Sequence, residues 1–163
     1  MDFNQLVKEY HQKVYWQVRR MVLQHDDAND LTQDIFLKVY QKYDTFKGES
    51  KFSSWLYRIA YNETINFLQK KSKYQSVSID DYLNNSVESL TSDAYFDGDQ
   101  LHLDLQKAIL GLPEKQRMVF LYRYYDELKY EEISEILGVS VGGLKANYHL
   151  ALQKLKHYFL EQD

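Results

Sequence analysis

Apolar residues recur at intervals of three and four along most of this chain, which is the spacing of one side of an α-helix. In the N-terminal half the pattern predicts helices over Asp2 to about Gln24, Asp27 to about Tyr43, and Ser50 to about Lys71. Breaks in such helices are scarce, because 163 residues contain one proline and six glycines. The chain is therefore predicted to be all-α.

The C-terminal half shows the same period with clearer punctuation. Helices are predicted over Gln100–Leu110, after Pro113, and on both sides of Gly138. Gly138 is placed as a helix stop, because glycine takes the left-handed conformation at low cost. Ser140 is placed to cap the following helix. Together these features give a helix-turn-helix pattern, which is typical of major-groove DNA binding but also occurs in all-α proteins that never bind DNA.

A polar, acidic stretch without sustained periodicity separates the two helical parts. It predicts two small helical domains joined by a flexible acidic linker, with residues 1–73 and 99–163 as the domains and residues 74–98 as the linker. Within the linker we expect one short turn of helix near Asp80–Leu83.

Charge is distributed unevenly along the chain, whose net charge is −4. Residues 73–100 carry one lysine and six acids, whereas the two ends are close to neutral. Phosphate neutralisation supplies most non-specific DNA affinity, so tight autonomous DNA binding is not favoured. A partner that carries the protein to DNA would remove this difficulty.

Several classes of protein are disfavoured by composition. The chain has no cysteine, which excludes a disulfide framework and a Cys-ligated zinc site. It has no apolar run near the ~20 residues needed to span a bilayer. Its N-terminus lacks the basic-then-apolar order of a signal peptide. We therefore expect a cytoplasmic protein.

The second predicted helix carries a polar, acidic side with one leucine in it, opposite an apolar stripe. This side comprises Asp30, Gln33, Asp34, Leu37 and Gln41. It is either an ordinary solvated helix face or a docking surface for a basic partner helix, with Leu37 as an apolar anchor.

The third predicted helix is dense in aromatic residues and follows a basic loop. One side, with Phe52 and Trp55, is assigned to the core. The other is expected to be exposed and includes Ser54, Tyr57, Arg58, Tyr61 and Asn62. Rings, a guanidinium and an amide on one side suit unpaired bases, through stacking, phosphate contact and base-edge contact respectively.

Three segments, in this order, resemble the extracytoplasmic-function (ECF) sigma factors. The segments are DDANDLTQDIFLKVYQKYDTF, KFSSWLYRIAYNETINFLQKKSK and LPEKQRMVFLYRYYDELKYEEISEILGVSVGGLKANYHLALQKLK. The resemblance implies a bacterial sigma factor that binds core RNA polymerase and directs promoter recognition, melting and transcription initiation. It implies no catalytic residue, cofactor or metal, and it allows an anti-sigma factor as a partner.

The resemblance also implies roles for matched positions. Polymerase would bind Asp30, Gln33, Asp34, Leu37 and Gln41. The minus-ten element would contact Phe46, Lys47, Lys51, Tyr57, Arg58, Tyr61, Asn62, Lys70 and Lys71. The minus-thirty-five element would contact Ser140, Gly142, Gly143, Lys145, Ala146, Asn147 and His149.

Some positions depart from the family pattern. Tyr61 stands where many members have arginine, Gly143 replaces a common threonine, and Asn147 replaces a common arginine. The recognition helix thus loses a hydroxyl and a guanidinium as DNA contacts, so the minus-thirty-five preference transfers least.

Two alternatives compete with this interpretation. His25 and Asp26 form an HD pair, as in metal phosphohydrolases, although Asp26 or Asp27 is better explained as a helix N-cap. A stand-alone helix-turn-helix regulator with an N-terminal sensor or interaction domain explains residues 101–163 equally well, but gives the acidic helix face no purpose.

Overall fold

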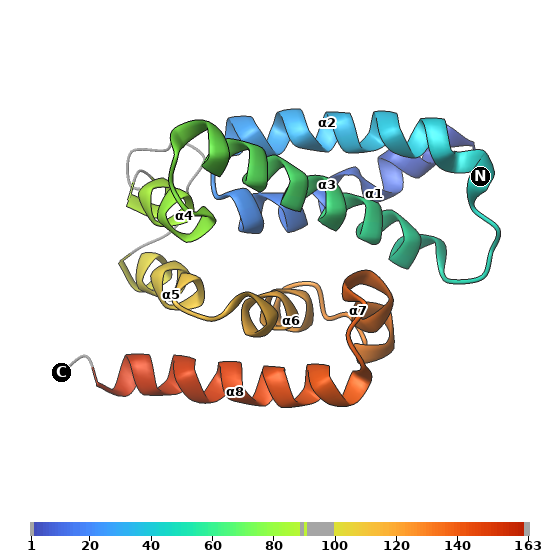
Figure 1. Cartoon of the computed structure of the whole chain (residues 1–163). Helices are drawn as coiled ribbons and strands as arrows, with labels where there is room; N and C mark the ends of the chain where they lie inside the picture. The colour runs from blue at the N-terminus through green and yellow to red at the C-terminus, as the bar shows by residue number, and fades with distance from the viewer. Residues whose placement is uncertain (1, 89, 91–99, 162–163) are drawn as a thin grey trace. The chain divides into compact units, whose positions relative to one another are not determined.

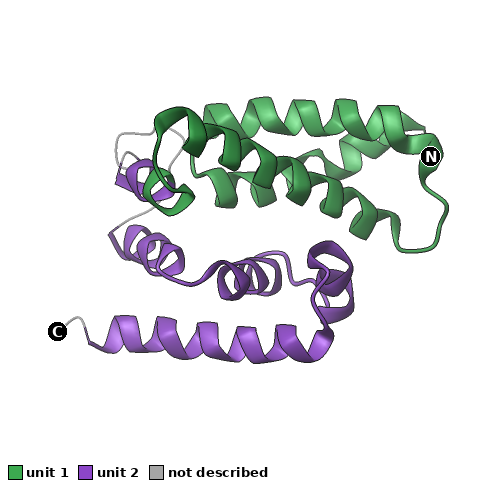
Figure 2. Cartoon of the chain, in the orientation of Figure 1, with its two compact units in different colours: residues 1–82 green, residues 83–163 purple. Residues whose placement is uncertain are grey.

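The computed structural model describes residues 2–88, 90 and 100–161, within which every regular element is a helix (Figure 1). The chain divides into two compact units, Met1–Tyr82 and Leu83–Asp163 (Figure 2). The predicted all-α architecture is thus confirmed. Residues 89 and 91–98 of the predicted linker lie outside the described residues.

The first unit is a three-helix bundle of α1 (Phe3–Val22), α2 (His25–Lys42) and α3 (Phe52–Gln75), in which each helix contacts the other two. Asp2 starts α1 with a capping box. Its carboxylate accepts a 2.8 Å hydrogen bond from the backbone N–H of Gln5, and the Gln5 side-chain oxygen accepts one of 3.3 Å from the backbone N–H of Asp2. Aliphatic side chains from all three helices form the core, among them Val14, Val18, Ile35, Val39 and Leu56.

Helix α2 begins earlier than predicted. Its N-cap is Gln24, so Asp26 and Asp27 lie in the first turn and the N-cap prediction for them is wrong. The cause is the short connection from α1, where Leu23 takes a left-handed conformation (φ 70°) and its carbonyl accepts a hydrogen bond from the Arg19 guanidinium. In the first turn the two carboxylates still face the positive end of the helix dipole.

The predicted linker contains more structure than expected. Helix α3 continues to Gln75 and ends with Ser76 in a left-handed conformation (φ 55°). A ten-residue helix, α4 (Ile79–Glu88), then replaces the single turn expected near Asp80–Leu83. Tyr82, Leu83 and Val87 on α4 are buried. Tyr82 and Leu83 are adjacent and Val87 follows four residues after Leu83, which is a short apolar pattern among asparagines, aspartates and serines.

The second unit consists mainly of α5 (Gln100–Leu110), α6 (Glu114–Tyr124), α7 (Tyr130–Leu137) and α8 (Val141–Leu160). Helix α8 contacts each of the other three. Its buried stripe is Leu144, Ala151 and Leu155, whereas Leu152 is 42% exposed. A long helix packed along one side needs only this narrow stripe.

Candidate functional site

The polar side of α2 is a continuous exposed surface. Asp30, Gln33, Asp34 and Gln41 are all exposed, and Leu37 is 62% exposed. Tyr40 is also 65% exposed, and its ring meets that of Phe3 edge-on, with ring centroids 5.0 Å apart. This surface, which we call the docking face, therefore combines two carboxylates with apolar area from Leu37 and Tyr40.

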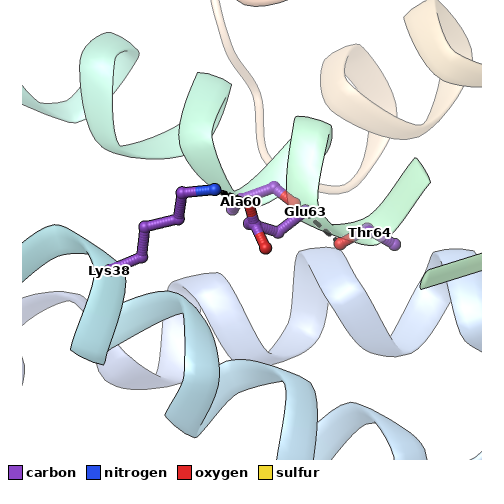
Figure 3. A network of polar contacts seen from close by, with 4 residues as sticks. All are labelled: Lys38, Ala60, Glu63 and Thr64. Carbon is purple, nitrogen blue, oxygen red and sulfur yellow. Dashed lines mark hydrogen bonds and ion pairs between the residues drawn. The ribbon is translucent and has the colours of Figure 1, made fainter. Parts of the chain in front are cut away.

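A lysine on α2 is directed away from the docking face. The Lys38 ammonium forms an ion pair with the Glu63 carboxylate on α3 (Figure 3). One residue further along α3, the Thr64 hydroxyl donates a 2.7 Å hydrogen bond to the Ala60 carbonyl within the same helix. Because Lys38 is paired with Glu63, its charge does not neutralise the acids of the docking face.

The exposed side predicted for α3 is only partly present. Arg58 and Asn62 are exposed and Tyr61 is half-buried. Tyr57, however, is 5% exposed, with its ring centroid 6.3 Å from that of Tyr10, and Ser54 is 1% exposed. The prediction that Tyr57 and Ser54 are exposed is wrong, because α3 packs against both α1 and α2 and so buries two of its sides.

An aromatic cluster anchors the loop before α3. Phe46 is half-buried, with ring centroids 5.5 Å from Phe52 and 5.2 Å from Trp55. Tyr10 of α1 joins the cluster 5.6 Å from Phe52. Burial raises the pKa of the Tyr10 phenol above its usual value, and the nearby Glu9 carboxylate adds to this effect. Phe46 thus ties the loop to the bundle.

The tip of this loop is open and cationic. Lys47 and Lys51 are exposed, and Gly48 between them has φ +74°, a conformation that favours glycine. At the other end of α3, Lys70 is exposed, while Lys71 is half-buried with its ammonium 5.5 Å from the Phe67 ring centroid. The basic residues predicted to bind DNA therefore flank Arg58 and Asn62 along the chain on both sides.

The helix-turn-helix forms as the sequence predicts. Gly138 ends α7 in a left-handed conformation (φ 70°). The Ser140 hydroxyl caps α8 by accepting a 3.1 Å hydrogen bond from the Gly143 amide. A Cβ atom on Gly143 would lie 3.1 Å from this hydroxyl oxygen, so glycine here leaves the cap undisturbed.

The predicted DNA-contacting residues of α8 differ in accessibility. Ser140, Gly142, Lys145, Ala146 and His149 are exposed, whereas Gly143 and Asn147 are half-buried. Sequence reasoning missed Tyr130 at the start of α7, whose ring lies near both Lys145 and Arg123. The missed signal is a tyrosine placed at a helix start between basic residues of the two flanking helices.

The HD pair does not assemble a metal site. His25 is engaged through its Nδ1 atom, which lies 2.6 Å from the Tyr15 hydroxyl. Among the residues that the structure describes, no three histidines or acids are grouped so as to hold a metal ion. In the same part of the chain, none of the helices has the length and apolar character required to cross a membrane.

Both helical parts of the chain match known protein families. Residues 6–74 match the Sigma-70 region 2 family, and residues 102–155 match the Sigma-70, region 4 family. The chain is 35% identical to the ECF RNA polymerase sigma factor SigW of Bacillus subtilis (strain 168), covering 94% of this chain and 87% of the relative. It is 31% identical to the ECF RNA polymerase sigma-E factor of Escherichia coli (strain K12), covering 94% and 84% respectively.

Two solved structures share the fold. One is the sigma factor RpoE bound to the anti-sigma factor NepR from Bartonella quintana, with a TM-score of 0.74, 22% identity and 99% of both chains covered. The other is CnrH bound to the cytosolic domain of CnrY, with a TM-score of 0.73, 20% identity, and 99% of this chain and 89% of CnrH covered.

Proposed function

Because this chain belongs to the ECF sigma factors of RNA polymerase, we propose that separate surfaces of its two units carry out polymerase docking, promoter melting and duplex recognition. The protein binds core RNA polymerase and directs it to promoters for transcription initiation. The observation that carries the division of labour is the exposed docking face of α2, which a stand-alone DNA-binding regulator would not need.

The docking face binds a basic helical surface of core polymerase. Asp30 and Asp34 supply negative charge, and Leu37 and Tyr40 supply apolar area that becomes buried on binding. Charge complementarity speeds the encounter and aligns the partners, while burial of the apolar side chains slows dissociation. Gln33 and Gln41 extend the same surface with polar contacts.

The loop and α3 of the first unit capture the minus-ten element as single-stranded DNA. Lys47, Lys51 and Arg58 neutralise phosphates, while Tyr61 offers a ring for stacking and Asn62 an amide for a base edge. Lys70 and Lys71 extend the positive charge at the far end of α3. Tyr57 contributes by packing with Tyr10 and not by touching DNA.

The helix-turn-helix of the second unit reads the minus-thirty-five element as duplex. Ser140 and the amides at the start of α8 face phosphate, and Lys145 supplies charge. Asn147 contacts a base edge, and the small side chains of Gly142, Gly143 and Ala146 allow the helix to approach closely.

The protein has no catalytic chemistry of its own and acts in the cytoplasm, where core polymerase works. An anti-sigma factor is a further partner, because sigma factors of this fold have been solved in complex with such inhibitors. Neither unit is strongly basic, so neither binds DNA tightly alone. Attachment to polymerase supplies the missing affinity by holding both units at one promoter.

Size-exclusion chromatography of the purified chain mixed with bacterial core RNA polymerase tests this function. We expect co-elution, followed by enrichment of promoter-like fragments from a random DNA library. A folded chain that fails to co-elute, yet binds duplex DNA, would be a stand-alone regulator instead.

A pair of variants tests the division of labour. Asp34→Lys should weaken core binding and leave the fold intact. Lys145→Ala should leave core binding unchanged and weaken contact with the upstream promoter element. Equal effects of both variants on core and DNA would contradict the assignment of surfaces.

A further inference from the structure

The ring of Tyr130 lies where three helices of the second unit meet. Tyr130 is the first residue of α7 and is half-buried. The Arg123 guanidinium of α6 lies 4.6 Å from its ring centroid, and the Lys145 ammonium of α8 lies 5.8 Å from it. The Tyr148 ring of α8 meets it edge-on, at 6.3 Å and 73°.

We propose that Tyr130 is a positioning residue for DNA recognition: its ring, fixed by Arg123 and Tyr148, holds the Lys145 ammonium in place at the DNA-facing end of α8. This proposal rests on the proposed function, because it assigns a supporting residue to the duplex-reading site. It concerns how Lys145 is oriented and does not make Tyr130 a DNA contact.

The two neighbours that fix the ring are themselves anchored. Arg123 donates a 2.9 Å hydrogen bond from Nη1 to the Leu128 carbonyl in the turn before α7. Tyr148 stacks on the buried Phe120 of α6, with centroids 6.3 Å apart and planes inclined by 24°. The orientation of the Tyr130 ring therefore follows from the packing of α6 and α8.

Lys145 gains from such a platform because it is exposed and flexible. A lysine that searches many rotamers loses that freedom when it binds phosphate. An ammonium within about 6 Å of an aromatic centroid is attracted to the ring, which narrows the range of rotamers before DNA arrives. Arg123 on the same ring adds positive potential, which favours an approaching phosphate.

A double-mutant cycle measures this role in the holoenzyme. The probe is a promoter fragment that the wild-type holoenzyme has itself selected from a random library. We expect Tyr130→Leu to weaken binding about two- to fivefold, the size of an exposed cation–π contact. Tyr130→Phe, which keeps the ring, should restore nearly full affinity.

The decisive comparison is made in the Lys145→Ala background. If Tyr130 acts through Lys145, Tyr130→Leu will have no further effect there. If the two losses simply multiply, Tyr130 has only a structural role and the proposal is overturned. Tyr124→Leu is the matched control, because it removes another aromatic ring of the same unit. That ring stacks on Phe120, with ring centroids 5.2 Å apart.

A second readout needs no DNA. Ring current from Tyr130 should shift the ε-methylene protons of Lys145 upfield in the NMR spectrum of the free chain, and Tyr130→Leu should abolish that shift. Unshifted protons in the folded wild-type chain would overturn the contact. A chain that shows the shift but selects no promoter would place the failure in the proposed function and not in the ring contact.

Discussion

Helices α2 and α3 lie side by side in the first unit, yet the sequence predicts the exposed residues of α2 better than those of α3. On α2 the residues predicted to meet polymerase are all exposed, opposite a buried stripe with Leu31, Ile35 and Val39. On α3 the side predicted to meet DNA is split, since Arg58 and Asn62 are exposed while Tyr57 and Ser54 are buried. Each of these helices packs against the other two helices of the bundle, and the apolar period alone locates the covered side of α2 but misses part of the covered surface of α3.

The largest expected effect separates core from surface on α3. Tyr57→Ala should lower the free energy of unfolding of the first unit by about 3 kcal/mol, because it truncates a large buried ring. The adjacent Arg58→Ala should change stability by less than about 0.5 kcal/mol. Denaturant unfolding followed by tryptophan fluorescence checks this, since both tryptophans, Trp16 and Trp55, lie in the first unit. If Tyr57→Ala unfolds at the same denaturant concentration as the wild type, Tyr57 does not stabilise the core and belongs to the DNA-binding side of α3.

The second effect concerns α2. Asp34→Lys should weaken affinity for core polymerase about tenfold or more, because a like charge then faces a basic partner. Titration of core polymerase into a fluorescently labelled chain measures the affinity. Glu9→Lys, the same reversal of charge at an exposed acid of α1, is the matched control and should bind core normally. Equal loss in both variants would mean that general charge, and not the docking face, drives binding.

A smaller effect distinguishes the exposed part of α3 from its buried part. Arg58→Ala should reduce the dependence of promoter affinity on salt by about one unit in the logarithmic slope, because one phosphate contact is lost. Promoter binding by the holoenzyme, measured over a series of salt concentrations, gives this slope. Lys8→Ala on the exposed side of α1 should leave the slope unchanged, and an unchanged slope in Arg58→Ala would remove Arg58 from the DNA site.

The smallest effect is expected at the ion pair that joins the two helices. Glu63→Gln should cost no more than about 1 kcal/mol, because the side chains of Lys38 and Glu63 are 36% and 22% exposed and water screens the pair. Unfolding at low and high salt checks this, and the difference between wild type and variant should shrink as salt rises. A loss that persists at high salt would indicate that Glu63 stabilises α3 by packing.

Local chemistry explains which parts of the fold could be predicted from sequence. Gly138 and Ser140 specify the helix-turn-helix through their own backbone and hydroxyl, so the turn can be predicted without any tertiary contact. The docking face followed from the apolar period of α2 in the same way.

Tertiary contacts explain what the sequence did not reveal. Tyr57 is buried against Tyr10 of α1, and Tyr82 of α4 is buried and donates a hydrogen bond to Asp27, 55 residues earlier. The Tyr130 ring has one cation near it from α6 and another from α8. None of these relationships is visible within a window of one helix.

Permanganate footprinting of the selected promoter tests the central claim most directly, because it detects unpaired thymines. With core polymerase and this chain together, we expect reactive thymines in the downstream element, while the upstream element stays paired and is protected from nuclease. Core polymerase alone should give neither signal. Upstream protection without reactive thymines would show that the chain binds duplex DNA but does not open it, which would contradict its proposed role in promoter melting.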